Sequence, residues 1–192
     1  VAVGAPRAKG DNKDDINGDD SDFYNQEGAV LIYKLDGTSW TQLGDRLYSA
    51  LNNDANQYFG WSVSLSNNGY TLAVGAPHTD HNGIEYVGAT EIYEFDGTSW
   101  NQKGSTITQT TAKMYLGWSV ELTGDGDTIV IGTRSTSDVS AGFVEVYDYV
   151  GTNWVQKGGK IETTIGTTAN KEYFGESVSI TNDGNSDLQP DW

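Results

Sequence analysis

Oxygen-bearing side chains are densest between residues 7 and 27, where aspartates alternate with other residues. Three of them stand at every second position, which is the spacing by which a calcium loop folds around its ion. Carboxylates this dense repel one another unless a cation neutralises them. Two interpretations stay open, calcium binding and a solvated acidic loop, because Gly18 and the lack of a following bidentate Glu depart from the EF-hand pattern. The candidate calcium ligands are Asp15, Asn17, Asp19, Asp20 and Asp22.

Two further groups could bind ligands. His78 and His81 flank Asp80, so a transition metal could use them, although a polar loop without metal explains them equally. Trp61 and Trp118 stand at the same place in two copies of a repeat and are candidates for stacking on sugar rings. The third copy has another residue there, so this tryptophan is not obligatory for packing. Packing nevertheless stays an alternative to ligand stacking.

No catalytic constellation is recognisable. Ser, His and Asp all occur, but nothing resembles a nucleophile elbow or the order of a catalytic triad. A glycine-rich loop that cradles phosphate before a helix is missing as well. We therefore expect a binding or structural protein and no enzyme.

Internal repeats organise the chain. A tryptophan-containing segment occurs three times, and a second motif of the type Phe-Gly-x-Ser-Val alternates with it. The glycines of the second motif, Gly60, Gly117 and Gly175, recur at intervals of 57 and 58 residues. A third motif, Leu-Ala-Val-Gly-Ala-Pro at 72–77, follows the second motif, and the chain opens with a version of it, Val-Ala-Val-Gly-Ala-Pro at 1–6. A period of this length is typical of repeated supersecondary units.

Each unit is predicted to contain four strands, over 61–66, 71–76, 89–95 and from Trp100 to about Ile107. The first strand alternates apolar and serine residues, as a half-buried strand does. Asn-Gly and Asp-Gly dipeptides separate the strands and favour tight hairpins. In the third strand, Glu91 and its counterpart Glu145 point away from the apolar face. The repeated Trp40, Trp100 and Trp154 are expected to pack between neighbouring units.

This pattern predicts an all-β chain of four-stranded antiparallel meanders, arranged as β-propeller blades. The alternatives are a β-sandwich, which does not need near-identical strands at a fixed period, and a β-solenoid, which usually has shorter coils. Phe-Gly-x-Ser-Val followed by x-Ala-Val-Gly-Ala-Pro resembles the FG-GAP repeat of integrin α-chain propellers. The resemblance implies calcium in the first hairpin of each blade. The hairpins 66–71 and 123–128 have too few carboxylates for that site.

The predicted divisions are a partial blade at 1–57, blades at 58–114 and 115–172, and the start of another at 173–192. This gives about three blade equivalents, whereas propellers have roughly four to eight. We therefore expect 1–192 to be part of one propeller domain, either in a longer chain or completed by a second copy.

Charge and composition limit the partners. The net charge of −16 opposes binding to nucleic acid or to an anionic membrane. No apolar run approaches the roughly 20 residues that span a bilayer, and no cysteine is present to form disulfides. We expect an extracellular or cell-surface module that binds proteins in adhesion. The alternatives are a structural subunit of a filament or coat, which would self-assemble, and a propeller lectin, which would bind glycans.

Overall fold

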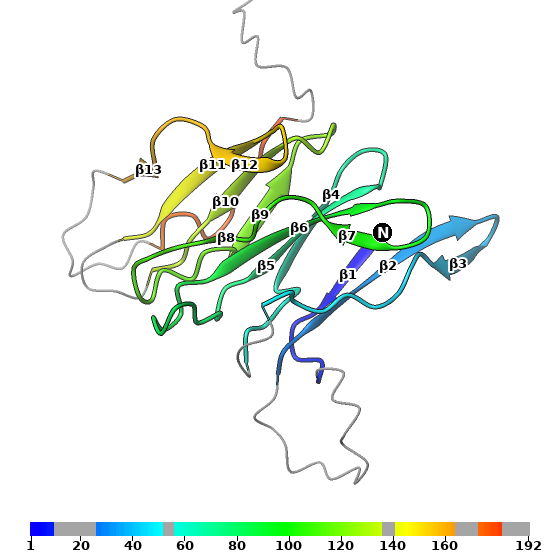
Figure 1. The fold of residues 1–192 in the computed structure, drawn as a ribbon, viewed down its shortest axis with the longest axis horizontal. Helices are drawn as coiled ribbons and strands as arrows, with labels where there is room; N and C mark the ends of the chain where they lie inside the picture. Colours follow the sequence, from blue (N-terminus) through cyan, green and yellow to red (C-terminus); the bar gives the residue numbers. More distant parts are fainter. Residues whose placement is uncertain (10–25, 52–55, 136–140, 164–172, 182–192) are drawn as a thin grey trace, which may run out of the picture.

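The computed structural model describes residues 1–9, 26–51, 56–135, 141–163 and 173–181. Within these ranges the chain contains strands and turns and no helix (Figure 1). The strands form three antiparallel sheets that follow one another along the sequence. The predicted all-β class and its antiparallel meanders are therefore confirmed.

The first sheet has the order β1-β2-β3, with β1 (Ala2–Ala5), β2 (Ala29–Asp36) and β3 (Ser39–Gln42). The second sheet has the order β4-β5-β6-β7, with β8 also pairing with β6. Its strands are β4 (Ser62–Leu65), β5 (Thr71–Ala76), β6 (Ala89–Phe95), β7 (Trp100–Gln102) and β8 (Ile107–Thr108). The third sheet repeats this plan with β9 (Ser119–Leu122), β10 (Thr128–Gly132), β11 (Phe143–Val150), β12 (Asn153–Gln156) and β13 (Ile161–Glu162).

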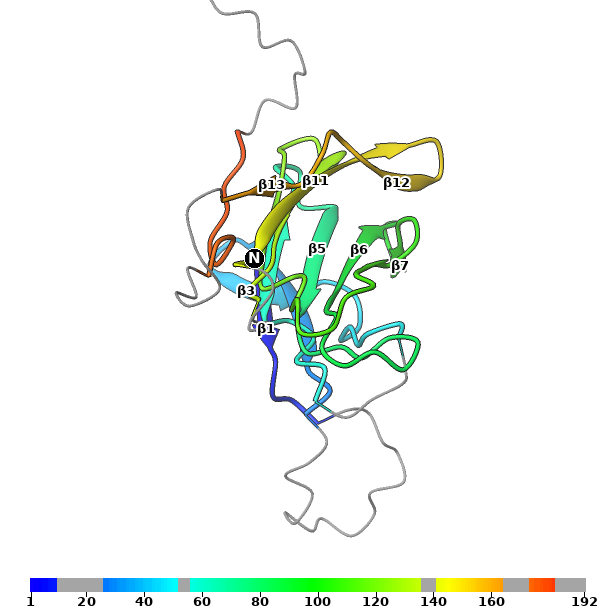
Figure 2. The same ribbon diagram turned by 90° about the vertical axis from the view of Figure 1, so that its left-hand side faces the viewer.

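Neighbouring sheets face each other as successive blades, a twisted arrangement that Figure 2 shows from the side. The inner strands of neighbouring blades lie together, because β4 contacts β9, the first strand of the next blade, and β1, the second strand of the preceding blade. Strands of one sheet pair in sequence order without a helical crossover, which is the connectivity of a propeller blade. The structure thus shows consecutive parts of a β-propeller.

Sequence periodicity located the central strands correctly. Strands β5 and β6 have the predicted bounds, and their pairing continues without a bulge from Thr71 opposite Glu94 to Ala76 opposite Ala89. The turn glycines, such as Gly69 (φ 74°) and Gly97 (φ 102°), have the left-handed backbone that these hairpins require. The predicted fourth strand is wrong as one element, because β7 and β8 pair with different parts of β6 and an unpaired stretch separates them.

Both faces of the second sheet are covered, which differs from the half-buried strands expected from the alternation. All six residues of β5 are buried. Leu72 and Val74 belong to a core shared with the first sheet, and Ala73 to a second core shared with the third sheet. The serines of β4 likewise face a neighbour, since the Ser62 hydroxyl donates to the Gly117 carbonyl at 2.8 Å. The core of this protein therefore lies between the sheets.

Glycines of two different motifs meet where adjacent blades approach each other. A Cβ atom on Gly75 would lie 2.0 Å from the Gly117 carbonyl oxygen, and Gly132 has the same relation to Gly175. Gly4 and Gly60 repeat this contact between the first two sheets. A side chain cannot fit at that separation. The two glycine motifs recur together because each supplies one side of the same inter-blade contact.

The repeated tryptophans attach each blade to the preceding one. The indole N–H of Trp100 donates to the Leu43 carbonyl at 3.0 Å, and that of Trp154 donates to the Lys103 carbonyl at 2.7 Å. Both rings are more than nine-tenths buried. Trp40 is 57% exposed, because among the described residues no sheet covers that face of β2 and β3. The predicted inter-blade packing therefore occurs at two of the three tryptophans.

Two buried carboxylates add to these contacts, and the sequence pattern did not indicate them. Glu91 is fully buried and accepts hydrogen bonds from the Ser49 hydroxyl (2.6 Å), the Ala50 amide (2.9 Å) and the Tyr93 hydroxyl. Glu145 is 2% exposed and accepts a hydrogen bond from the Gln109 amide at 2.7 Å. Each carboxylate thus binds the segment that leaves the preceding blade. Burial and the adjacent Glu91 charge raise the pKa of Tyr93 above its usual range.

The last described segment keeps the glycine contact without forming a strand. Residues 177–180 correspond to β4, but no strand is assigned among residues 173–181. The domain divisions predicted from the repeats stay a prediction.

Candidate functional site

The candidate calcium ligands Asp15, Asn17, Asp19, Asp20 and Asp22 lie outside the described residues, so calcium binding there stays a prediction. The hairpins between the first and second strands are described in two blades. In one, the Asn68 side-chain oxygen accepts the Tyr70 amide at 2.8 Å. In the other, Asp125 accepts the Thr123 hydroxyl at 2.5 Å and the Asp127 amide at 3.1 Å. The Thr123 hydrogen bond is the main cause that lowers the pKa of Asp125. These side chains close the turns themselves.

A lysine ammonium lies against the second of these hairpins. Lys103 belongs to the preceding blade and reaches across to this hairpin. Its Nζ is 2.7 Å from a carboxylate oxygen of Asp127 and 3.2 Å from the Gly126 carbonyl oxygen. Its side chain is 7% exposed, and the ammonium lies 4.6 Å from the centre of the Tyr149 ring. The cation beside the Asp127 carboxylate is therefore the ammonium group of Lys103.

Aromatic side chains gather at the other end of the blades. The first and second strands of a blade are antiparallel, so the residues before β4 and after β5 lie at one end of the sheet. The same end of the next blade carries the residues before β9. We call the resulting surface the aromatic rim; it consists of Tyr58, Trp61, His78, Tyr86, Tyr115 and Trp118.

The structure brings the two predicted stacking residues together. The ring centres of Trp61 and Trp118 are 4.6 Å apart and their planes are inclined by 49°. His78 lies between tyrosines, 4.5 Å from Tyr58 and 5.1 Å from Tyr115. Trp61 and Tyr86 are each 37% exposed. The rim therefore combines rings that hold one another in place with ring surface open to a ligand.

Backbone geometry fixes the tyrosines of the rim. Tyr58 and Tyr115 directly precede the glycine motif in two blades and have φ of 56° and 52°. Tyr86 also has a left-handed backbone, with φ of 50°. This conformation costs a residue with a side chain roughly 1–2 kcal/mol. It is held by turn hydrogen bonds, such as that from the Trp61 amide to the Tyr58 carbonyl at 3.0 Å. Such local strain is typical of binding sites.

An arginine extends the rim from the third sheet to the segment that follows it, residues 173–181. The Arg134 guanidinium carbon lies 4.5 Å from the centre of the Trp118 ring and 4.4 Å from that of Tyr173. Its Nε is 3.7 Å from a carboxylate oxygen of Glu176. Glu176 is the third-copy counterpart of Trp61 and Trp118. The third copy therefore has an ion pair with Arg134 at the position where the first two copies have a tryptophan. A planar cation between two rings has well-defined geometry and can contact a further partner.

The surroundings of His78 in the rim disfavour its charged form. Burial, and next the charge of Arg134, lower its pKa, while Asp80 acts in the opposite direction. Asp80 accepts the Tyr86 amide at 2.7 Å and so fixes the loop. The His81 backbone bonds reciprocally with that of Ile84. In the described part of the chain, no cluster of three or more His, Cys, Asp or Glu residues could hold a metal.

Several rim residues were missed by the sequence reasoning. A tyrosine precedes the glycine motif in all three copies, and this repeated signal could have identified Tyr58, Tyr115 and Tyr173. Tyr86 and Arg134 lie in loops of different length and sequence, so only the folded chain brings Tyr86 to Tyr115 and Arg134 to Trp118.

Comparison with known families agrees with the geometry of the inter-blade contacts. The FG-GAP repeat family matches residues 49–90. The chain carries an FG-GAP-type repeat. This matched segment contains β4, β5 and the first half of the rim, including Tyr58, Trp61 and His78. A search of curated proteins gives no match to the chain.

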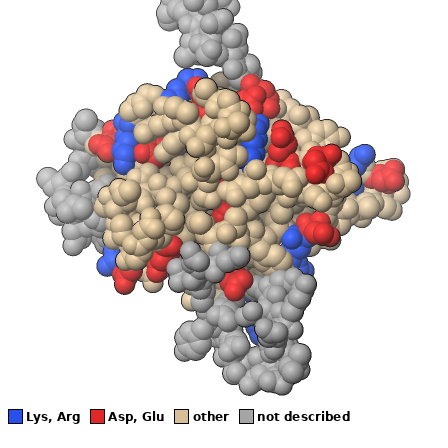
Figure 3. Space-filling view, viewed as in Figure 1, with Lys and Arg blue, Asp and Glu red and all other residues tan. Residues whose placement is uncertain are grey.

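The FG-GAP repeat indicates a propeller-type module for protein interaction. In the described residues, no helix has the length and apolar character needed to cross a membrane. Charged side chains lie mostly toward the margin of the face drawn in Figure 3. The chemistry available at the rim is ring stacking, cation–π contact and hydrogen bonding.

Proposed function

We propose that this chain is a non-enzymatic, extracellular or cell-surface propeller module that binds a protein partner in adhesion through the aromatic rim. The contact between Trp61 and Trp118, with Arg134 beside it, is the observation that carries the proposal. Trp, Tyr and Arg are the residues that contribute most binding energy at protein interfaces. The rim presents all three at the ends of strands that two inter-blade cores hold in place.

A binding role suits the polar groups of the rim better than a catalytic one. His78 is surrounded by rings and its charged form is disfavoured. Asp80 accepts a hydrogen bond from its own loop. Both groups support the shape of the surface and are poorly placed to exchange protons with a substrate.

Adhesion of beads coated with the 192-residue chain to intact cells tests the proposal. Trp61→Ala is expected to reduce adhesion at least about tenfold, as loss of a central aromatic contact does at protein interfaces. Trp40→Ala is the matched control, because Trp40 is also exposed but lies on β3, away from the rim. Adhesion that persists in Trp61→Ala would contradict the proposal.

Two alternatives make different predictions for the same variants. A propeller lectin would use Trp61 and Trp118 to stack on sugar rings, so a glycan array would show binding that Trp61→Ala abolishes. A filament or coat subunit would instead use the exposed apolar residues of the first sheet, Val3, Leu35 and Trp40. In that case, electron microscopy would show assemblies that Trp40→Ala disrupts.

A further inference from the structure

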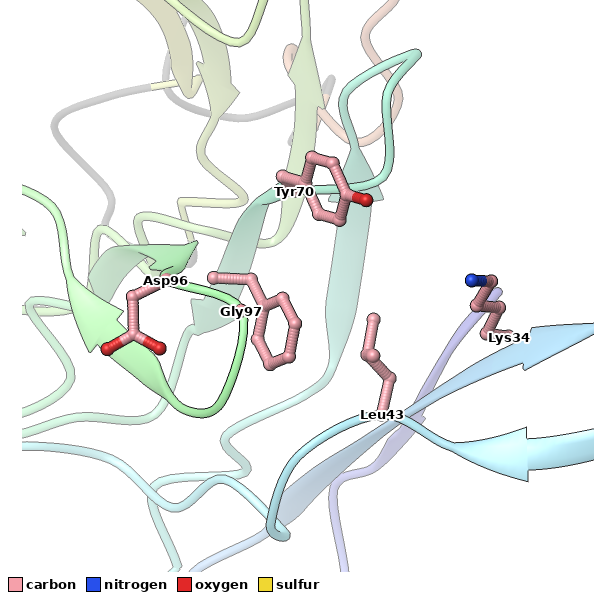
Figure 4. Close-up of a pocket in the computed structure, with 6 residues that line it drawn as sticks. Lys34, Leu43, Tyr70, Asp96 and Gly97 are labelled. Atoms are coloured by element: carbon pink, nitrogen blue, oxygen red, sulfur yellow. The ribbon is translucent and has the colours of Figure 1, made fainter.

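A groove lies between the first and second sheets, at the opposite end of β4 from the aromatic rim. Its volume is ≈ 460 Å³, within the range of about 300–1,000 Å³ found for small-molecule sites. Figure 4 shows the lining residues that it labels, contributed by both sheets. The groove is lined by Lys34, Leu43, Tyr70, Phe95, Asp96 and Gly97.

The next inter-blade joint has a lysine and an aspartate at the positions that correspond to Leu43 and Tyr70. Leu43 and Lys103 each stand three residues after the repeated tryptophan, and Tyr70 and Asp127 each follow the hairpin glycine. Between the second and third sheets, the Lys103 ammonium lies over the Tyr149 ring and pairs with the Asp127 carboxylate. That joint thus contains an alkyl chain, an ammonium and a carboxylate.

The groove has an apolar wall and an ammonium, and it lacks the carboxylate. Tyr70 and Phe95 stack with ring centres 6.2 Å apart and planes inclined by 17°. Tyr70 stands where the other joint has Asp127. The amino group of Lys34 is directed toward the space between Leu43 and Tyr70 (Figure 4), and no carboxylate pairs with it in the described part of the chain.

Asp96 does not supply the missing partner. Its carboxylate is directed away from Leu43 and Tyr70 (Figure 4). The oxygens accept hydrogen bonds within its own turn from Thr98 (2.8 Å), Ser99 (2.8 Å) and Asn101 (2.8 Å). These hydrogen bonds, with Ser99 contributing most, hold the pKa of Asp96 well below its usual range. Compared with the joint between the second and third sheets, an apolar body and a free carboxylate are missing.

We propose that this groove binds a small aryl or alkyl carboxylate. Its apolar body lies against Leu43, Tyr70 and Phe95, which line the groove. Its carboxylate pairs with the Lys34 ammonium, as Asp127 pairs with Lys103. The proposal is independent of the function proposed for the rim, because the two sites share no residue.

Titration of the 192-residue chain with 3-phenylpropionate, followed by NMR, tests the proposal. Salt of about 0.15 M limits the influence of the overall negative charge, because the Debye length is then about 8 Å. We expect saturable shifts at Tyr70 and Phe95 with a Kd of about 1 mM or lower. The amine 3-phenylpropylamine has the same apolar body and is expected to bind at least about tenfold more weakly, because it lacks the charge-assisted contact.

Three variants locate the site. Lys34→Met keeps the apolar stem of an exposed residue and is expected to weaken binding about tenfold. Leu43→Lys with Tyr70→Asp copies the lysine and the aspartate of the other joint into the groove and is expected to abolish binding. Lys103→Met, in the other joint, is expected to leave binding unchanged. The absence of saturable shifts up to about 10 mM, equal binding of the amine, or full binding by Lys34→Met would each overturn the proposal.

Discussion

The joint between the first and second sheets and the joint between the second and third share three contacts. In each, two glycines touch, a tryptophan N–H bonds to the preceding blade, and a buried glutamate binds the segment that leaves that blade. They differ where one has Leu43 and Tyr70 and the other has Lys103 and Asp127. The common contacts connect the blades. The positions that differ line a groove in the first joint and form an ion pair in the second.

The largest effect is expected from the glycine contact. Gly75→Ala would place a Cβ 2.0 Å from a carbonyl oxygen of the next blade, so the blades must separate. We expect a loss of about 4 kcal/mol or failure to fold, the range of severe core disruption. Urea denaturation measures the free energy of unfolding. Gly69→Ala is the control: its φ is 74° with open space around it, so the cost is about 1–2 kcal/mol. Equal losses in the two variants would contradict the inter-blade role.

The tryptophan contact is the next in size. Trp100→Phe keeps an aromatic ring but removes the donor to the Leu43 carbonyl, leaving a gap and an unpaired acceptor. We expect destabilisation of about 2 kcal/mol in thermal or urea unfolding. Trp40→Phe, at the equivalent exposed position, is expected to change stability by less than about 0.5 kcal/mol. A similar cost at both positions would show that the repeated tryptophan stabilises its own blade instead.

Substitutions at the differing position sharpen the comparison directly. Lys103→Met removes a buried ammonium from Asp127 and the Gly126 carbonyl, and should cost about 1–2 kcal/mol. Because Asp127 is 58% exposed, solvent compensates in part for the loss of its ammonium partner. Leu43→Met exchanges one apolar side chain for another and should cost less than about 1 kcal/mol. Unfolding is measured in low and in high salt. The loss of stability caused by Lys103→Met should depend on the salt concentration, whereas the loss caused by Leu43→Met should not.

The smallest effect concerns pH. The folded-state pKa of His78 is lowered, so the unfolded chain binds a proton more readily. The contribution of His78 to stability is therefore complete above its unfolded pKa of 6.5 and is lost as the pH falls through the folded value. His78→Asn should flatten this part of the stability profile below pH 6.5, measured by urea unfolding at a series of pH values. An unchanged profile would contradict a neutral His78 in the rim.

The sequence was most informative where local patterns decide the structure. Strands β5 and β6 were predicted to the residue because apolar runs and Gly-containing turns mark their ends. Glu91 was assigned to the face away from the core, yet it is fully buried, because a blade is covered on both faces. Trp61 and Trp118 were singled out from their repeat. Their contacts with His78 and Arg134 depend on loops of unequal length that only folding brings together.

The distinction between connecting residues and binding residues is tested most directly by one variant, Trp61→Ala, measured for both unfolding and adhesion. Trp61 is partly exposed and belongs to the rim. The prediction is a loss of stability below about 1 kcal/mol together with at least a tenfold loss of adhesion. Destabilisation of about 3 kcal/mol or more, as for a core tryptophan, with adhesion intact, would contradict it.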